Sequence, residues 1–265
     1  MQKTILITGS TDGIGLETAK MLTSLGHHVL LHGRNLEKLE KVQKTLLELK
    51  GGGCIEIYLA DLSLMNNVEE LAKTVAEKHS KLDVLINNAG VYNAPDPVTQ
   101  NGLDIRFAVN TIAPYLLTKR LLSLLGTSGR VINLSSAAQS SVKVEALTGR
   151  VKLGDGAAYA QSKLALTMWS RSLGLSLKDS GPIIIAINPG SLLGSKMVKQ
   201  AFGVTGGDIR IGAEILTRAA LRDEFKTASG QYFDNDSGQF ASPHPDALDT
   251  GKCQEIVSVI ETVLA

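Results

Sequence analysis

A glycine-rich segment near the amino terminus constrains the fold of this chain more than any other feature. It runs Thr8-Gly9-Ser10-Thr11-Asp12-Gly13-Ile14-Gly15, follows the apolar residues 4–7 and leads into residues 16–22, whose composition suits a helix. A turn from strand to helix presents free N–H groups and the positive end of the helix dipole at one point. The segment therefore predicts a binding site for an anion, and the pyrophosphate of a dinucleotide suits it best.

The three glycines have the spacing Gly-x3-Gly-x-Gly, which differs from the usual dinucleotide pattern Gly-x-Gly-x-x-Gly. We expect Gly9 to reverse the chain, Gly13 to let the backbone approach a ligand, and Gly15 to let the helix pack closely. An ordinary strand-to-helix turn can carry similar glycines, so the interpretation depends on the rest of the chain.

Short apolar runs alternate with helical patterns along the sequence. Strands are expected at residues 4–7, 28–32, 54–59, 82–86, 130–134, 182–187 and 230–234, and helices at 16–22, 36–50, 64–79, 102–125, 157–177 and 253–264. This alternation predicts an α/β fold of three layers, with a parallel sheet between helices and a ligand crevice at the carboxyl ends of the strands. Residues 139–155 and 190–207, the second with a short helix at 195–202, follow strand ends, and we expect both to enclose a substrate.

Composition limits the partners. A chain of 265 residues, 43% hydrophobic, suits one domain spanning residues 1–265. A net charge of +1 gives no reason to expect nucleic acid or an anionic membrane as a partner. The two cysteines lack metal-ligand spacing and no apolar run is long enough for a membrane span, so we expect a cytoplasmic protein with no metal site.

Two side chains on the helix expected at 157–177 suggest acid/base chemistry. Tyr159 and Lys163 are four residues apart, so they share one face of the helix. A nearby ammonium favours the phenolate, which would lower the tyrosine pKa from about 10 toward a useful range. Ser136 ends the strand before this helix, where its hydroxyl could bond a substrate oxygen. Each residue taken alone is compatible with an ordinary helix or turn.

In combination these residues resemble the short-chain dehydrogenase/reductase family. The resemblance runs from Lys3 to about Met197, and it rests on the glycine turn, Asn87-Asn88-Ala89-Gly90, Asn110, Ser136, Tyr159, Lys163 and Pro189-Gly190. It implies a Rossmann-type, doubly wound fold and hydride transfer between a nicotinamide cofactor and a carbonyl/alcohol pair.

The resemblance also implies a role for each catalytic residue. Tyr159 would be the general acid/base, and Lys163 would lower its pKa and hold the nicotinamide ribose. Ser136 would orient the substrate carbonyl, and Asn110 would support a proton-relay water. The family places its catalytic serine second in such a pair, which selects Ser136 over Ser135.

Further residues are expected to bind the cofactor by the same resemblance. They are Gly9, Ser10, Thr11, Asp12, Gly13, Ile14, Gly15, Arg34, Asp61, Leu62, Asn88, Ala89, Gly90, Tyr159, Lys163, Pro189, Gly190 and Ser195. Ser195 is the nearest candidate for the threonine that contacts the nicotinamide in the family. The insertion at 139–155 resembles a loop of retinol-dehydrogenase-like members, which makes a bulky hydrophobic carbonyl compound a plausible substrate.

The end of the second expected strand indicates which cofactor is used. The sequence there is His32-Gly33-Arg34-Asn35, with no acidic residue to accept from a ribose 2′-hydroxyl. A guanidinium suits a 2′-phosphate, so Arg34 favours NADP(H), with NAD(H) less favoured. The alternative for Arg34 is a solvated surface charge.

The sequence thus predicts an NADP(H)-dependent oxidoreductase that acts on CH–OH and C=O groups. An alternative is a regulatory protein that binds NADP(H) without turnover, although such a protein would not need the four catalytic side chains. A sugar-nucleotide epimerase or dehydratase is disfavoured because fewer than 80 residues follow Pro189. The substrate, the reaction direction and the oligomeric state, including a homodimer or homotetramer, stay open.

Overall fold

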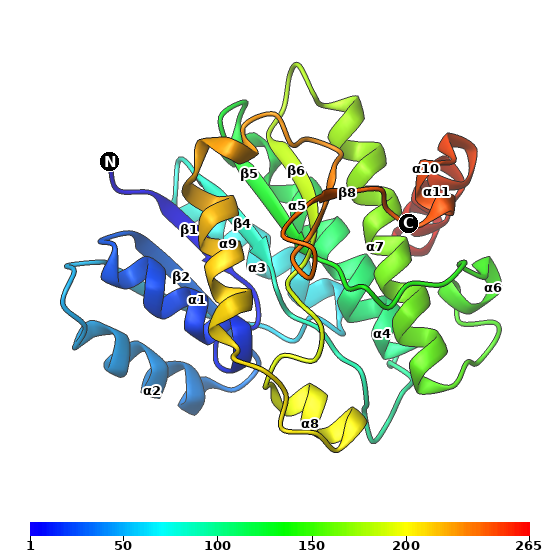
Figure 1. The fold of residues 1–265 in the computed structure, drawn as a ribbon, viewed down its shortest axis with the longest axis horizontal. Helices are drawn as coiled ribbons and strands as arrows, with labels where there is room; N and C mark the ends of the chain where they lie inside the picture. Colours follow the sequence, from blue (N-terminus) through cyan, green and yellow to red (C-terminus); the bar gives the residue numbers. More distant parts are fainter.

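A mostly parallel sheet forms the centre of the molecule (Figure 1). The computed structural model describes the backbone of residues 1–265 and every side chain except that of Phe202. The strand order is β3-β2-β1-β4-β5-β6-β7-β8, and only the pairing of β7 with β8 is antiparallel in this sheet of the described chain. The strands are β1 (Thr4–Ile7), β2 (His28–Gly33), β3 (Ile55–Leu59), β4 (Val84–Asn87), β5 (Arg130–Leu134), β6 (Ile183–Asn188), β7 (Tyr232–Asp234) and β8 (Gln239–Ala241).

The sheet is buried on both faces because its central strands are apolar throughout. Ile5 and Ile7 of β1 pack into one hydrophobic cluster, whereas Leu6 packs into the other, as the two-residue repeat of a strand requires. All three side chains have no exposed surface. The prediction of an α/β fold with a Rossmann-type parallel sheet is therefore confirmed.

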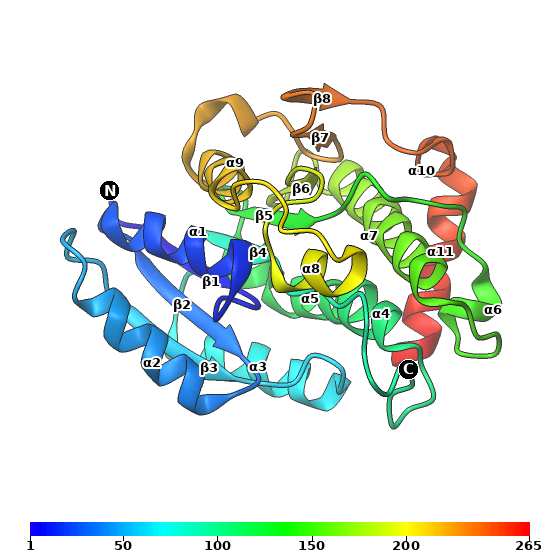
Figure 2. The same ribbon diagram turned by 60° about the horizontal axis from the view of Figure 1, so that its bottom comes forward.

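Helices cover the two faces. Buried residues of α1, α2 and α9 belong to one cluster, and those of α3, α5, α7 and α11 to the other. Figure 1 shows α1 and α9 in front of the strands, and Figure 2 shows α11 on the outer side of α7. The helices are α1 (Gly13–Ser24), α2 (Leu36–Leu47), α3 (Met65–Lys78), α4 (Ile105–Phe107), the π-helix η1 (Ala108–Ile112), α5 (Ala113–Leu125), α6 (Val144–Leu147), α7 (Asp155–Ser176), α8 (Lys196–Phe202), α9 (Arg210–Leu221), the 3-10 helix η2 (Asp223–Phe225), α10 (Pro245–Leu248) and α11 (Thr250–Leu264).

Several elements differ from the sequence-based expectation, among them the short helices α6, η2 and α10, which were not predicted. The helix expected at 102–125 is interrupted by one π-helical segment, Ala108–Ile112. The strand β8 and the helix α9 were not predicted. The apolar residues of α9, such as Ile215, Leu216 and Ala219, are spaced as in a helix and are buried against α1 and the sheet, so that signal was present in the sequence. Among the described residues, no helix is both long and apolar enough to cross a membrane.

Candidate active site

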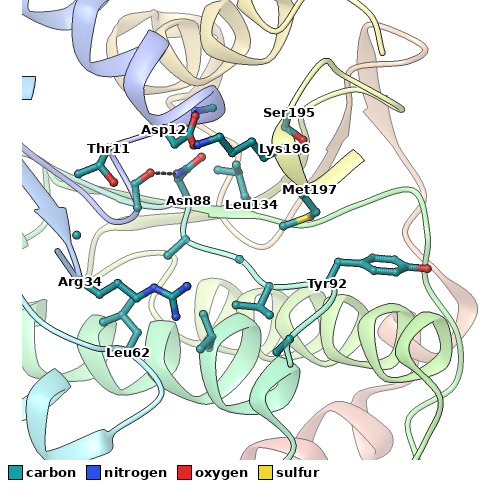
Figure 3. Close-up of a pocket in the computed structure, with 18 of the residues that line it drawn as sticks. Thr11, Asp12, Arg34, Leu62, Asn88, Tyr92, Leu134, Ser195, Lys196 and Met197 are labelled. Carbon is teal, nitrogen blue, oxygen red and sulfur yellow. Dashed lines mark hydrogen bonds and ion pairs between the residues drawn. The ribbon is translucent and has the colours of Figure 1, made fainter. Parts of the chain in front are cut away.

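A cleft of about 750 Å³ lies along the carboxyl ends of the parallel strands. The glycine turn after β1 and the ends of β2 and β3 form one side of it. Further lining comes from the start of α2, the segment after β4, α4 and η1, the end of β5, α7, the segment after β6 and the start of α8 (Figure 3). The strand order reverses between β1 and β4, and a doubly wound sheet opens a ligand crevice at such a point.

The glycine turn is held by close contacts that leave no room for side chains. A Cβ on Gly15 would lie 2.4 Å from both the Gly9 carbonyl oxygen and Asn88 Nδ2. Gly9 has a φ of +64°, and a Cβ there would lie 2.9 Å from the Ala89 Cα atom. The amide of Asn88 donates to the carbonyl oxygens of Thr8 and Gly9 at 2.9 and 3.0 Å. The side chain of Asn88 therefore fixes the shape of the turn.

His32 is a supporting residue that the sequence analysis missed. Its Nδ1 accepts a hydrogen bond from the Gly9 amide at 3.1 Å, so its Nε2 carries the proton and donates to the Ala60 carbonyl oxygen at 3.2 Å. Burial lowers the pKa of His32 to about 4, which keeps the ring neutral. Ser10 Oγ accepts from the His32 amide at 2.9 Å and is fully buried. Ser10, predicted to bind the cofactor, therefore points beneath the turn and supports it from below.

At the first turn of α1, where an anion site was expected, Asp12 lies beside Lys196 of α8. Asp12 caps this helix by accepting from the Gly13 amide at 2.8 Å, and its carboxylate pairs with Lys196 of α8 at 2.8 Å. Burial opposes ionisation of Asp12, but Lys196 and the Gly13 amide outweigh it and hold the pKa of this carboxyl below its ordinary value. The negative charge of Asp12 is thus balanced by α8, a contact that joins two segments far apart in the sequence.

Two basic side chains line the cleft beyond β2. Arg34 was predicted there, and Figure 3 shows its guanidinium beside Leu62 in the cleft. Lys38, which the sequence analysis missed, lines the same region from the first turn of α2. Asn35 caps α2 by accepting from the Lys38 amide at 2.8 Å, which fixes the start of this helix beside Arg34. Asp61 lines the same cleft, and its Oδ1 accepts a hydrogen bond from the Ser63 amide at 2.9 Å.

The predicted catalytic side chains meet at the other end of the cleft. Tyr159 and Lys163 both lie on α7, and the Lys163 Nζ is 5.7 Å from the centroid of the Tyr159 ring. Lys163 is almost fully buried and donates to the Leu134 carbonyl oxygen at 2.6 Å. The Ser136 hydroxyl lies close enough to the Tyr159 phenol to oppose the rise of its pKa, whereas Ser135 is turned toward α7 with its Oγ 2.7 Å from Thr167 Oγ1. The second serine is therefore the one that faces the phenol.

The pKa of Tyr159 differs from the sequence-based expectation. Burial raises it above the ordinary value for a phenol, and the bond from Ser136 opposes this only in part. The ammonium of Lys163 does not reverse the direction, since its short bond goes to Leu134 and it stands 5.7 Å from the ring centre. Burial also lowers the pKa of Lys163 to about 8. At neutral pH the phenol is thus protonated.

The lowered lysine pKa predicts a pH dependence of stability. Between pH 8 and about 10.5 the unfolded chain binds more protons at Lys163 than the folded chain, so raising the pH in this window favours folding. We take the free energy of unfolding of wild type minus that of Lys163→Met. We expect this difference to rise by about 1 kcal/mol between pH 7 and pH 9. Urea unfolding of both proteins at the two pH values measures it. A difference that stays constant or falls would contradict the buried ammonium.

Asn110 lies within the π-helical segment, and π-bulges are common at functional sites. Its side-chain oxygen accepts from the Val91 amide at 2.8 Å, and its nitrogen donates to the Val91 carbonyl oxygen and to Ser162 Oγ, both at 2.9 Å. Both ends of the amide are therefore engaged. The geometry supports a positioning role for this side chain, which ties the segment after β4 to α7.

The two loops expected to enclose a substrate have different positions. The segment after β6 contributes Pro189, Ser195 and Met197 to the cleft, and Ser195 caps α8 by accepting from the Val198 amide at 3.2 Å. The expectation for 139–155 is wrong, because no residue of this range lines the cleft in the described structure. Its helix α6 packs against α11 instead, with Ala146 and Leu147 buried. Apolar burial against the carboxyl-terminal helix explains this position.

Comparison with known proteins identifies the family. The model for the short chain dehydrogenase family matches residues 3–206. The chain belongs to this family. Retinol dehydrogenase 13 of Mus musculus is 32% identical over 93% of the chain and 79% of its own length.

Solved structures of the short-chain dehydrogenase fold agree with this assignment. An uncharacterised protein from Mycobacterium paratuberculosis superposes with a TM-score of 0.82 at 26% identity, over 99% of this chain and 93% of the other. A short chain dehydrogenase from Burkholderia cenocepacia J2315, in complex with NADP, superposes with a TM-score of 0.72 at 25% identity, over 89% and 97% of the two chains. The family uses an NAD(P) cofactor, and the present chain is an oxidoreductase of this family.

The cleft fits such a cofactor chemically. There is free space beside the backbone at the start of α1. A Cβ on Gly13 would have no neighbouring atom closer than a methyl carbon of Ile209, at 3.8 Å. The helix dipole and the cations of Arg34 and Lys38 favour phosphate groups at this end. Lys163 and Tyr159 line the same cleft beyond Gly90.

Proposed function

We propose that this protein is an NADP(H)-dependent oxidoreductase that interconverts a bulky apolar carbonyl compound and its alcohol. The observation that carries the proposal is that Tyr159, beside Ser136, and the buried Lys163 line the cleft that begins at the glycine turn. The cofactor supplies or accepts the hydride when bound. The protein aligns the reacting groups and moves the proton.

The protonation state of Tyr159 suits carbonyl reduction. Its raised pKa keeps the phenol protonated at neutral pH, so it can donate a proton to the developing alkoxide. The Ser136 hydroxyl lies beside the phenol and can donate a second hydrogen bond to the same oxygen. The Lys163 ammonium, fixed by the Leu134 carbonyl, places a positive charge near the phenolate that remains. Oxidation of the alcohol uses the same groups in reverse.

The lining of the cleft supports an apolar substrate. Val91, Tyr92, Ile105, Val109 and Met197 are among the residues that line the cleft. The Tyr92 ring packs at 4.8 Å, centroid to centroid, on the ring of Tyr159. Together with the similarity to a retinol dehydrogenase, this lining favours a long, unsaturated alcohol or aldehyde of the retinoid kind.

A panel of carbonyl compounds tests this function. NADPH oxidation is measured by the loss of NADPH absorbance. At equal substrate concentrations, we expect a higher rate with retinal and other large apolar aldehydes or ketones than with acetone or glyceraldehyde. Saturable binding of NADPH with no oxidation by any compound of the panel would instead favour a regulatory protein. A preference for the small polar carbonyls would contradict the substrate class and leave the hydride transfer intact.

A further inference from the structure

Three potential metal ligands meet at the opposite end of the sheet from the cleft. His28 is the first residue of β2, Glu56 is the second residue of β3, and His79 directly follows α3. Their ligand atoms all lie within 4.8 Å of one another, and no other group of this kind occurs among the residues that the structure describes. Three residues of β2 stand between His28 and His32, the first residue of this strand that lines the cleft, a separation of roughly 13 Å at the rise of a strand.

The folded chain directs these side chains toward one point. His28 Nε2 lies 2.9 Å from Glu56 Oε1, and His79 Nε2 lies 3.5 Å from Glu56 Oε2. The Tyr58 hydroxyl is 2.9 Å from Glu56 Oε2 and 2.9 Å from His79 Nε2. Each carboxylate oxygen thus faces a different imidazole, with a phenol beside them.

The strand register explains why these residues converge. Leu30 pairs with Glu56 across β2 and β3, and His32 pairs with Tyr58, so His28, Glu56 and Tyr58 share one face of the sheet by the two-residue repeat. The end of α3 brings His79 over the same face. The side chains of His28, Glu56 and His79 are 20%, 35% and 11% exposed, so solvent reaches the cluster while packing holds it.

We propose that His28, Glu56 and His79 form a binding site for a divalent transition-metal ion, with Zn²⁺ as the preferred occupant. Two imidazole nitrogens and a carboxylate are an established zinc donor set, and water or Tyr58 completes four-coordination. The ion takes the place of the Nε2 protons, which pass to solvent or to Nδ1. Bound there, it links β2, β3 and the end of α3 at the edge of the sheet and stabilises the folded state.

One neighbouring charge opposes a cation at this site. Lys78 Nζ lies 5.1 Å from the centroid of the Tyr58 ring, and its positive charge acts on the Glu56 carboxylate. Lys78 is exposed and supplies no ligand atom. Replacing it by a neutral residue should therefore strengthen metal binding while leaving the donor set intact.

Calorimetric titration of the chelator-treated, untagged full chain with ZnCl₂ tests the site. We expect one ion per chain, with affinity reduced about tenfold or more by Glu56→Gln and by His79→Gln. His244→Gln is the matched control. His244 lies 3.8 Å from the Asp246 carboxylate but belongs to no cluster of three potential ligands among the described residues. The Zn²⁺ affinity of this variant should equal that of wild type. Lys78→Gln should bind more tightly than wild type. At a hundredfold excess of Zn²⁺ over Kd, we expect a Tm rise of about 4 to 8 °C.

Specific results would overturn the site. Absence of stoichiometric Zn²⁺ binding would do so, as would equal affinity in wild type, Glu56→Gln and His79→Gln. Far-UV circular dichroism and NADPH binding show whether each variant is folded. If both ligand variants fail to fold, Lys78→Gln still tests the proposal, because unchanged or weaker Zn²⁺ affinity in this exposed variant contradicts it.

Discussion

Tyr159→Phe is expected to lower kcat by at least 10²- to 10⁴-fold, because it removes the proton donor and leaves the ring in place. The ring packs against Tyr92 in the cleft, so the phenylalanine keeps this contact and the shape of the site. NADPH affinity should stay within a few-fold of wild type. Steady-state rates with the best compound of the carbonyl panel, together with calorimetric titration of NADPH, measure both effects.

A second tyrosine in the same cleft provides the matched control. Tyr92 lies 4.8 Å from Tyr159, ring to ring, but not on α7 beside Lys163. Tyr92→Phe should therefore retain turnover within about tenfold, a change of about 1.4 kcal/mol in the barrier. If Tyr159→Phe kept more than a tenth of the wild-type rate, or if Tyr92→Phe lost more than Tyr159→Phe, the assignment of the acid would be wrong.

Arg34→Ala is expected to remove most of a roughly 10- to 100-fold preference for NADPH over NADH. The 2′-phosphate adds nearly two negative charges, and a partly exposed charge-assisted bond of this kind contributes about 1 to 3 kcal/mol. The preference is the ratio of kcat/KM with the two cofactors. Lys38 lines the same end of the cleft, so Arg34→Ala combined with Lys38→Ala should reduce the ratio further.

Lys41→Ala serves as the control for charge alone, since Lys41 is exposed on α2 outside the lining of the cleft. It should leave the cofactor ratio unchanged. Equal kcat/KM with NADPH and NADH in wild type, or a preference that survives loss of both Arg34 and Lys38, would refute the phosphate site. Introducing an acid at Gly33 is a poor test, because a Cβ there would lie 2.8 Å from Thr11 Cγ2.

Local sequence determined the layered fold because its signals act over short distances. A run such as Ile5-Leu6-Ile7 is apolar on both faces, and only a strand covered on both sides buries it fully. The four-residue spacing of Tyr159 and Lys163 places them on one helical face whatever surrounds the helix. The π-helical interruption at Asn110 left no comparable pattern in the sequence, and that side chain bonds Val91 and Ser162, which lie in distant segments.

Tertiary packing determined the direction of each functional side chain and the charge that it carries. The sequence predicted a lowered pKa for Tyr159, whereas burial in the folded cleft raises it, since desolvation depends on neighbours from distant segments. His32, Lys38 and the pairing of Asp12 with Lys196 became visible only when separate strands and helices met.

The same distinction applies to the loops and to the second site. In the sequence, residues 139–155 follow the end of a strand. In the folded chain, α6 of this range packs against α11, which begins more than a hundred residues after residue 139, and it lies outside the cleft. His28, Glu56 and His79 are 28 and 23 residues apart in the chain, too far for any local metal motif. Sequence alone determined the parallel strands, most of the long helices and the residues predicted for catalysis, because short-range periodicity and spacing encode them. Only the folded structure determined which of those residues meet, because strand register and helix packing set distances between segments that the sequence leaves independent.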